Sequence, residues 1–352
     1  MRFGVFWLLQ RAEPGRPVQD RYADVVGQAQ LADELGFESA WFAEHHFSNY
    51  GLIPSPLMLI SYLAGQTSRI TLAPGILVLP FYQPLRLAAE CAMVDVLSKG
   101  RFICGIGRGY QAMEFRGHGL RQEDSRERFD ECVEILLKAW TERDWGFQGK
   151  HFQVPEGTTV VPEPLQRPHP PIWAAMWGSP ESVRNAARRG WPALAGGYFR
   201  PLEFLRDLRA RWDEELRLAG RDPASLPFAS VRHVTVVEDA REARRYVADL
   251  RWIDDVAAAL RREDQMLSGG HISAAPQADL DEDTVLARSI IGTPEQVVER
   301  IRQEQAAGVT KLLCHFDHGA LPQEDVLRSM RLFRDEVMPR FAEPPLASHL
   351  TL

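Results

Sequence analysis

The sequence lacks any long uninterrupted hydrophobic segment. Its first residues, Met1 to Leu9, form an apolar run that is too short for a signal peptide or a membrane span, and no small-residue cleavage site follows them. No later window is long and apolar enough either. We therefore expect no membrane partner and a cytoplasmic location.

Cysteine and clustered basic charge are also scarce. The four cysteines are far apart and form no C-x-x-C pair, so we expect reduced, mostly buried thiols: Cys91, Cys104, Cys132 and Cys314. The net charge is −7, and the 41 Lys and Arg residues are interspersed with 48 Asp and Glu residues. This balance argues against a nucleic-acid partner or an anionic membrane surface.

A glycine-rich phosphate turn after the first predicted strand is missing as well. Residues 10–14 contain no glycine, which disfavours an open doubly wound sheet. Neither an internal repeat nor a linker divides the chain, and 45% hydrophobic residues supply a sizeable core. We predict a single domain over residues 1–352.

What the sequence does contain is an alternation of strand-like apolar runs with segments of helical spacing. The predicted strands are 3–9, 39–43, 69–78, 101–106, 171–176, 193–195, 228–237 and 311–316. The predicted helices are 18–35, 56–66, 83–97, 125–140, 180–189, 201–218, 239–267, 294–307 and 324–340. Eight alternating strands predict the α/β class and a (β/α)8 TIM barrel. Residues 145–164 predict an excursion with a small hairpin, and residues 268–283 predict a mobile loop.

One predicted strand, residues 39–43, ends in three consecutive ionisable side chains: Glu44, His45 and His46. The carboxyl ends of barrel strands carry the active sites of TIM-barrel enzymes. Two structural histidines beside a carboxylate would be the simpler explanation of a shorter cluster. Three ionisable residues in a row after a buried strand favour a functional role.

Two further strand ends predict an anion site. Gly105, Gly107 and Gly109 flank Arg108, whose guanidinium suits a phosphate, although a tight turn with a surface arginine has the same pattern. Ser179 stands at a helix N-cap before Pro180, which provides free amides for an anion or merely caps the helix. Because the two segments follow adjacent strands, together they could hold one phosphate. Several aromatic residues near these ends suit a flat phosphorylated cofactor: Phe6, Trp41, Tyr110, Trp173 and Trp177.

A metal-dependent hydrolase is a weaker alternative. Consecutive residues of a strand cannot all point at one ion, and no H-x-x-x-H spacing supports Glu44, His45 and His46. His315 and His318 could add ligands, but strand order alone does not bring them to the same place. We predict no metal site.

Taken together, these motifs resemble the flavin-dependent, bacterial-luciferase-like monooxygenases. The segments that carry the resemblance are Trp41 to Phe47, Leu79-Pro80, Leu97 to Phe102, Gly105 to Gly109 and Ile291 to Val297. The resemblance runs from the first strand to about residue 190 and resumes near residue 291. It covers most of the chain, and the combination is specific although each piece is common.

The resemblance implies a TIM barrel, usually a homodimer, that binds reduced FMN (FMNH2) delivered by a separate NAD(P)H:flavin reductase. It implies reaction with O2 through a flavin C4a-peroxide and transfer of one oxygen atom to a small organic substrate. The oxygenation could be a Baeyer–Villiger reaction, aldehyde oxidation, hydroxylation or heteroatom oxidation. An F420-dependent hydride transferase on the same fold and a non-catalytic flavin-binding protein are the alternatives.

The resemblance also assigns roles to individual residues. His45 resembles the catalytic histidine, and Arg108, Ser179 and Ser182 resemble ligands of the cofactor phosphate. The remaining assignments are Gly75 and Ile76 at a non-proline cis peptide under the flavin ring, Tyr110 against the cofactor, Glu114 and Trp177 on the substrate or lid side, and a lid over residues 268–290. Gly107 stands where luciferase has a reactive cysteine, so light emission from a fatty aldehyde is not expected.

Overall fold

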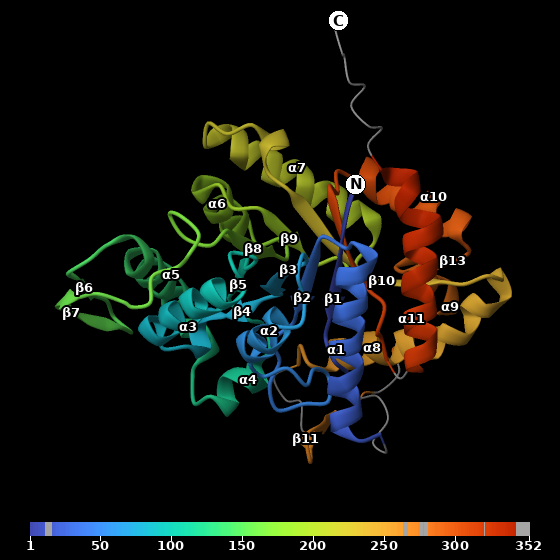
Figure 1. Ribbon diagram of the computed structural model, residues 1–352, viewed down its shortest axis with the longest axis horizontal. Coiled ribbons are helices and arrows are strands. Elements are labelled where there is room, and N and C mark those ends of the chain that lie inside the picture. The colour runs from blue at the N-terminus through green and yellow to red at the C-terminus, as the bar shows by residue number, and fades with distance from the viewer. Residues whose placement is uncertain are drawn as a thin grey trace, which may run out of the picture.

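The computed structural model describes residues 1–10, 16–262, 267–272, 274, 277, 281–319 and 321–342. Its central feature is a parallel α/β barrel with strands inside and helices outside (Figure 1). The barrel strands are β1 (Arg2–Trp7), β2 (Ser39–Phe42), β3 (Thr71–Pro74), β4 (Leu77–Val78), β5 (Cys104–Gly107), β8 (Ile172–Met176), β9 (Ala193–Ala195), β10 (Phe228–Val236) and β14 (Lys311–His315). Most strand residues are buried, as expected where helices cover the outer face and side chains fill the interior.

Strand pairing nearly closes the barrel and confirms the predicted fold class. The order is β3-β2-β1-β14-β10-β9-β8-β5-β4, and every pair along it is parallel. A parallel bridge between Leu72 and Phe102 joins β3 to the segment before β5. Since parallel strands that pair in register end together, the loops after these strands meet at one end of the barrel.

The predicted helices largely occur where the spacing placed them. The larger helices are α1 (Val18–Leu35), α2 (Pro56–Ala64), α3 (Pro84–Leu97), α5 (Ser125–Thr141), α6 (Pro180–Arg189), α7 (Leu202–Leu218), α8 (Val247–Ala259), α10 (Pro294–Ala306) and α11 (Gln323–Leu332). Gly36 ends α1 in the left-handed region with φ of 82°, a conformation that favours glycine. Thr293 and Gln296 form a capping box that starts α10.

The short elements occupy the connections. They comprise α4 (Ala112–Gly117), α9 (Glu282–Ala287), β13 (Ile290–Gly292), the antiparallel pairs β6 (Trp145–Gln148) with β7 (Gln153–Thr158) and β11 (Leu267–Ser268) with β12 (His271–Ile272), a π-helix (Phe333–Val337), and 3-10 helices at Leu79–Phe81, Gln122–Asp124, Pro223–Ser225, Ala240–Tyr246 and Met338–Phe341. The β6–β7 pair confirms the predicted hairpin in residues 145–164. Figure 1 places α4 and β11 at the end of the barrel toward which β1 runs.

Three predicted elements differ from the structure. The strand 69–78 is divided into β3 and β4, because the chain turns at Gly75 and Ile76. The helix 239–267 is wrong in extent: a 3-10 helix over Ala240–Tyr246 precedes α8, which ends at Ala259. The helix 324–340 is replaced by α11 followed by π- and 3-10 turns. Helical spacing alone does not distinguish these tighter and wider turns from α-helix.

The predicted lid over 268–290 contains regular elements. β12 and α9 lie within it, and β13, which begins at its last residue, pairs in parallel with β10. Residues 273, 275–276 and 278–280 of the predicted loop lie outside the described residues. The turn of β11–β12 contacts the loop after β2, since Asn49 N–H donates to the Gly270 carbonyl (2.8 Å).

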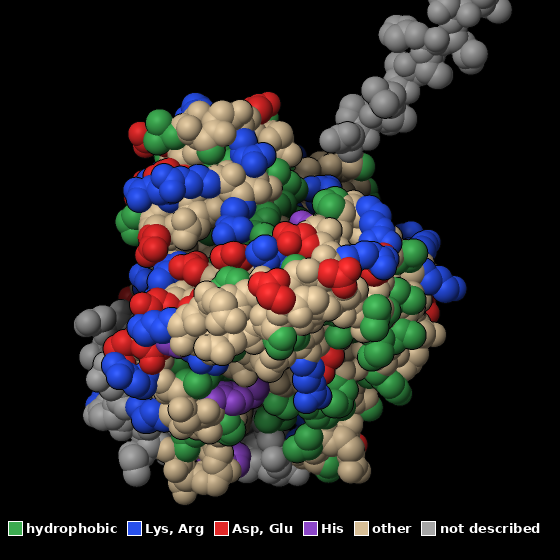
Figure 2. Space-filling view, turned by 90° about the vertical axis from the view of Figure 1, so that its left-hand side faces the viewer, with side chains coloured by type: hydrophobic (Ala, Val, Ile, Leu, Met, Phe, Trp, Pro, Cys, Tyr) green, Lys and Arg blue, Asp and Glu red, His purple; other side chains and the backbone are tan. Residues whose placement is uncertain are grey.

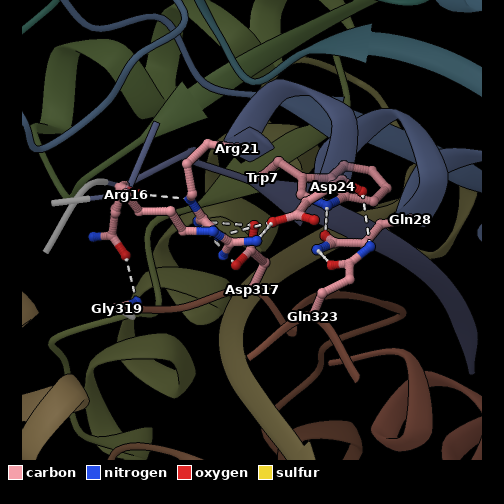
Figure 3. A network of polar contacts seen from close by, with 9 residues as sticks. Trp7, Arg16, Arg21, Asp24, Gln28, Asp317, Gly319 and Gln323 are labelled. Carbon is pink, nitrogen blue, oxygen red and sulfur yellow. Dashed lines mark hydrogen bonds and ion pairs between the residues drawn. The ribbon is translucent and has the colours of Figure 1, made fainter. Parts of the chain in front are cut away.

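A buried polar network ties the end of β14 to α1 (Figure 3). Arg21 donates to both carboxylate oxygens of Asp317, at 3.0 and 3.1 Å, and both side chains are buried. Beside them, Trp7 Nε1–H donates to Gln28, whose amide donates to Gln323. In each of these hydrogen bonds the two partners come from different elements. The network therefore fixes α1 and α11 against the carboxyl ends of β1 and β14.

Helix hydropathy, surface charge and the cysteines complete the description of the fold. No helix in the described part of the chain is long and apolar enough to cross a membrane. Figure 2 shows one face of the molecule, on which basic and acidic side chains are interspersed. All four cysteines are buried and unpaired.

Candidate active site

A cavity of about 360 Å³ opens at the carboxyl ends of the barrel strands, within the size range of small-molecule sites. Its wall contains residues from the ends of β1, β2, β5, β8 and β9, and from the loops that follow them. The sequence prediction named nine site residues, and all of them line this cavity: His45, Gly75, Ile76, Arg108, Tyr110, Glu114, Trp177, Ser179 and Ser182. The structure therefore brings together residues that are up to 137 positions apart in the chain.

His45 is held by residues of the loop and helix after β5. Its Nδ1 atom lies 3.0 Å from Oε1 of Glu114, and this carboxylate oxygen also accepts from the His46 backbone N–H (2.8 Å). Glu114 is buried and belongs to α4. Because a carboxylate only accepts, Nδ1 of a neutral His45 carries the proton, which leaves Nε2 with a lone pair.

Gln111 completes the contacts of His45. Its Nε2 atom lies 3.0 Å from His45 Nδ1 and 3.2 Å from the Tyr110 hydroxyl, while its buried Oε1 has no partner. Since Nδ1–H is donated to Glu114, the amide nitrogen of Gln111 donates to the Tyr110 hydroxyl and lies against Nδ1 without a hydrogen bond to it.

Glu44 and His46 point away from His45 and support the backbone. Glu44 accepts from His46 Nε2 (2.9 Å), from the Tyr82 hydroxyl (2.7 Å) and from the Val78 backbone N–H (3.1 Å). Glu44 thereby connects the end of β2 to β4. The alternation along an extended chain predicted this division of the three ionisable residues.

Guanidinium and hydroxyl groups gather where α6 begins. Arg108 follows β5, and Arg126 of α5 donates to the Ser182 hydroxyl (3.2 Å) and pairs with Glu181 (3.3 Å). The pKa of Arg108 is lowered from its ordinary value, first by partial burial and then by the positive charge of Arg126. Ser179 occupies the N-cap position, as predicted, but its side chain makes no cap hydrogen bond. Two cations beside a helix N-terminus are a chemically suitable site for a phosphate.

The segment between β3 and β4 forms another part of the wall. The peptide bond between Gly75 and Ile76 is cis, as the resemblance led us to expect. A Cβ atom at Gly107 would lie 2.7 Å from Cδ1 of Ile76, and one at Gly105 only 2.1 Å from the Pro74 carbonyl oxygen. The glycines of β5 therefore allow this strand and the segment between β3 and β4 to approach closely, in addition to any contact with a ligand.

A third group of residues surrounds the His45 side of the cavity. The rings of Tyr50 and Tyr110 lie 4.9 and 6.1 Å from the His45 ring. Tyr198 borders the cavity as well, and its hydroxyl lies 3.0 Å from Nδ1 of His315. Burial raises the pKa of Tyr50 and that of Tyr198 well above the ordinary value, so both hydroxyls stay protonated at neutral pH.

Behind Tyr198 lies a cluster of three buried histidines: His233, His315 and His318. The centre of the His233 ring lies 5.0 Å from the centre of the His315 ring and 5.3 Å from that of the His318 ring. Burial lowers the pKa of His315 and that of His318 to about 3, so the cluster is neutral. Both ring nitrogens of His233 lack a hydrogen-bond partner.

The histidines considered as metal ligands fall into two separate groups. Among the described residues, the ligand atoms that lie close enough together to share an ion belong to Asp124, Glu127 and His151, none of which lines the cavity. His315 and His318 contact His233 and Tyr198, whereas His45 contacts Glu114 and Gln111.

Sequence reasoning missed several residues of this site. Arg126, Asn185 and Arg261 line the cavity, and Gln111 contacts His45, which lines it. Each lies in a segment without a distinguishing motif. Glu114 was assigned to the substrate or lid side, whereas its carboxylate contacts His45. Among these residues, Gln111 alone directly follows a predicted site residue, Tyr110, and this position could have indicated it.

A cavity at the carboxyl ends of a parallel barrel is where TIM-barrel enzymes bind and convert their substrates, and the protein belongs to that class by fold and site. A family model described as luciferase-like monooxygenase matches residues 1–311. The chain is therefore a member of the luciferase-like monooxygenase family, and it is an oxidoreductase.

Curated relatives match over nearly the whole chain. A protein of Sinorhizobium fredii (strain NBRC 101917 / NGR234), described only as y4vJ, is 32% identical over 89% of this chain and 90% of its own length. The oxygenase component of a flavin-dependent trigonelline monooxygenase from Acinetobacter baylyi (strain ATCC 33305 / BD413 / ADP1) is 27% identical over 97% and 96% of the two chains.

Solved structures share the fold. The monooxygenase RslO1 from Streptomyces bottropensis has a TM-score of 0.86 and 28% identity, over 97% of this chain and 100% of that chain. The oxygenating constituent of 3,6-diketocamphane monooxygenase from Pseudomonas putida, a type II Baeyer–Villiger enzyme in complex with FMN, has a TM-score of 0.81 at 23% identity over 98% and 99%. An F420-dependent secondary alcohol dehydrogenase also matches, with a TM-score of 0.75 at 18% identity over 97% and 99%.

Proposed function

We propose that this protein is the oxygenase component of a two-component monooxygenase, which receives FMNH2 from a separate reductase and oxygenates a small organic molecule with O2. The observation that carries the proposal is the juxtaposition, in one cavity, of an oriented histidine and an anion-binding helix terminus. The relative named as the oxygenase component of a flavin-dependent monooxygenase supports the division into two components.

The residues of the cavity fit a phosphorylated flavin. Arg108 and Arg126 supply positive charge beside the first turn of α6, and Ser179, Ser182 and Asn185 supply polar groups at the same end. Toward His45 the wall becomes apolar and aromatic, which suits a flat ring. Reduced FMN, when bound there, supplies the electrons that activate O2.

His45 is the proposed catalytic residue. Its Nδ1 proton is directed to Glu114, so Nε2 is the nitrogen that can accept or return a proton at the substrate. Glu114 and Gln111 hold the ring, and the buried tyrosines Tyr50 and Tyr198 limit the access of water on this side. Exclusion of water matters, because a stray proton diverts reduced oxygen from the substrate to hydrogen peroxide.

Stopped-flow mixing of the anaerobic FMNH2–protein complex with O2 tests this function. We expect a long-lived absorbance that differs from both reduced and oxidised FMN, followed by product formation when substrate is present. Direct reoxidation to FMN without such a phase would contradict a monooxygenase. Tight binding of F420, with hydride transfer and no reaction with O2, would instead establish the hydride transferase, since a deazaflavin relative shares this fold.

Replacement of Arg108 tests the proposed phosphate site. We expect Arg108→Ala to weaken FMN about 10- to 100-fold and to leave riboflavin nearly unchanged, because charge-assisted hydrogen bonds to a phosphate contribute about 1.5–3 kcal/mol. Isothermal titration of both flavins measures the difference. Arg121→Ala is the control, since this exposed arginine pairs with Glu123 and Asp124 and does not line the described cavity. Equal losses of both flavins would remove Arg108 from the phosphate site.

An exposed apolar surface on α2 and α3 supports the proposed homodimer. Met58 and Tyr62 of α2 are 74% and 61% exposed, and α2 packs against α3, which exposes Met93, Val96 and Leu97. Adjacent exposed apolar side chains indicate a protein contact. We expect sedimentation velocity to show a dimer, and Tyr62→Glu to produce a monomer. Leu218→Glu, at an exposed leucine of α7, should leave the dimer intact. A wild-type monomer at micromolar concentration would contradict the proposal.

A further inference from the structure

The cavity wall includes a further arginine that the proposed cofactor site does not use. Arg261 lies just beyond α8 and borders the same cavity as His45. Its positive charge acts on the hydroxyls of Tyr50 and Tyr110, the two tyrosines beside His45. Arg108, in contrast, is influenced by Arg126, Glu181 and Asp130. The two guanidiniums therefore have different charged and polar neighbours.

Arg261 has no ion-pair partner in the described part of the chain. Of the neighbouring cations, Arg126 pairs with Glu181 and Arg288 lies 3.7 Å from Asp254, whereas the buried Nε of Arg200 has no hydrogen-bond partner among the described residues. The guanidinium carbon of Arg261 lies 5.8 Å from the centre of the Phe199 ring, which also borders the cavity. The guanidinium thus lies against an aromatic ring, and its charge also acts on Asp254.

The surface between Arg261 and His45 is largely apolar. It is formed by Phe6, Leu8, Tyr50, Tyr198, Phe199 and Val231. The Tyr50 hydroxyl shares a hydrogen bond with Tyr110 and stays protonated, because burial raises the pKa of Tyr50 well above its ordinary value. One guanidinium, neutral hydroxyl donors and an apolar floor suit a molecule with a single anionic group on an apolar or aromatic body.

We propose that the substrate of this enzyme is an apolar or aromatic monoanion, such as a carboxylate, whose charged group binds Arg261 while its body lies between Phe6, Tyr198 and His45. That the bound anion is the substrate rests on the proposed function. The binding of the anion to Arg261 does not. Arg261 is then a specificity-determining residue. The phosphate end of the cavity remains for the cofactor.

Binding of paired acids and amides to the protein tests this assignment. The probes are benzoate and phenylacetate with their neutral amides, each titrated against tryptophan fluorescence with and without oxidised FMN. We expect each acid to bind at least about tenfold more tightly than its amide, since one charge-assisted hydrogen-bond pair at a partly exposed site gives a difference of this size. Equal affinities of acid and amide would overturn the proposal.

Variants of Arg261 separate the guanidinium from the general charge of the protein. We expect Arg261→Gln to remove the preference for the acid, and Arg261→Lys to retain part of it. Arg262→Gln is the matched control, because this neighbouring arginine does not border the cavity. Unchanged preference in Arg261→Gln, or an equal loss in Arg262→Gln, would contradict a specific contact. FMN could fail to bind while the wild type still prefers the acid and Arg261→Gln does not. The proposed function would then be wrong, and the anion site at Arg261 would be retained.

Discussion

Substitution of His45 by Ala is expected to reduce product formation by about 10²–10⁴-fold, the usual contribution of a positioned acid–base group, while FMN affinity changes little. O2 consumption should continue and yield hydrogen peroxide in place of product. The reason is that His45 contributes its Nε2 to the reaction site but contacts no group of the proposed phosphate site. The measured quantity is the ratio of product to O2 consumed, for a substrate found by product profiling.

Two further variants distinguish chemistry from structure at this residue. Glu114→Gln keeps the shape of the carboxylate that contacts His45 but removes its charge, so we expect an intermediate loss of turnover with unchanged folding. His151→Ala replaces a histidine outside the cavity that pairs with Glu127, and it should leave the product ratio unchanged. A His45→Ala enzyme with the wild-type product ratio would show that His45 is not catalytic.

The buried histidine cluster predicts a large effect of pH on stability. The folded-state pKa values of His315 and His318 are about 3, below the unfolded value of about 6.5. Below pH 6.5 the unfolded chain binds protons that the folded chain does not, so the stabilisation present at neutral pH is lost as pH falls. Between pH 7 and pH 5 each of these histidines lowers the free energy of unfolding by about 2 kcal/mol.

Comparison of His318→Asn with the wild type isolates this effect. The wild-type curve alone is insufficient, because burial raises the pKa of Asp254 to about 7, and a buried carboxyl that binds a proton in the folded state stabilises it as pH falls through 7. We expect the variant to be less stable at pH 7, since it loses the contact with Thr235. Its stability should fall by about 2 kcal/mol less than that of the wild type between pH 7 and 5, as measured by urea unfolding. Parallel pH curves would contradict the assignment.

The sequence predicted the barrel well because its local signals agree with the tertiary structure. The apolar runs after residues 38, 171 and 192 form β2, β8 and β9, and the helix predicted over residues 180–189 is α6, with the same first and last residues. The predictions that failed concern segments that connect the barrel strands. The segment 239–267 has helical spacing throughout, but the packing of Tyr246 and the end of α8 at Ala259 depend on contacts with other elements. The prediction of one domain over the whole chain stays a prediction.

The site was predicted as residue types at strand ends, and each of the nine predicted residues lines the cavity. Their partners were not predictable. Arg126 and Arg261 lie in polar helical segments, where an arginine is ordinary, and only their position against the cavity distinguishes them. His233 lies within the long strand β10 and gave no signal either, because its contacts with His315 and His318 join positions far apart in the chain.

The sequence by itself determined the class of this protein, since period-two and helical spacing, together with polar residues after buried strands, are local properties that parallel barrels require. It also determined that Glu44 and His46 point away from His45, because side chains alternate along an extended chain. Only the tertiary structure decided that Glu114 and Gln111 contact His45, and that Arg108 and Arg261 line one cavity with it. Those relations depend on how strands close into a barrel, and closure is a property of long-range pairing that no local pattern encodes.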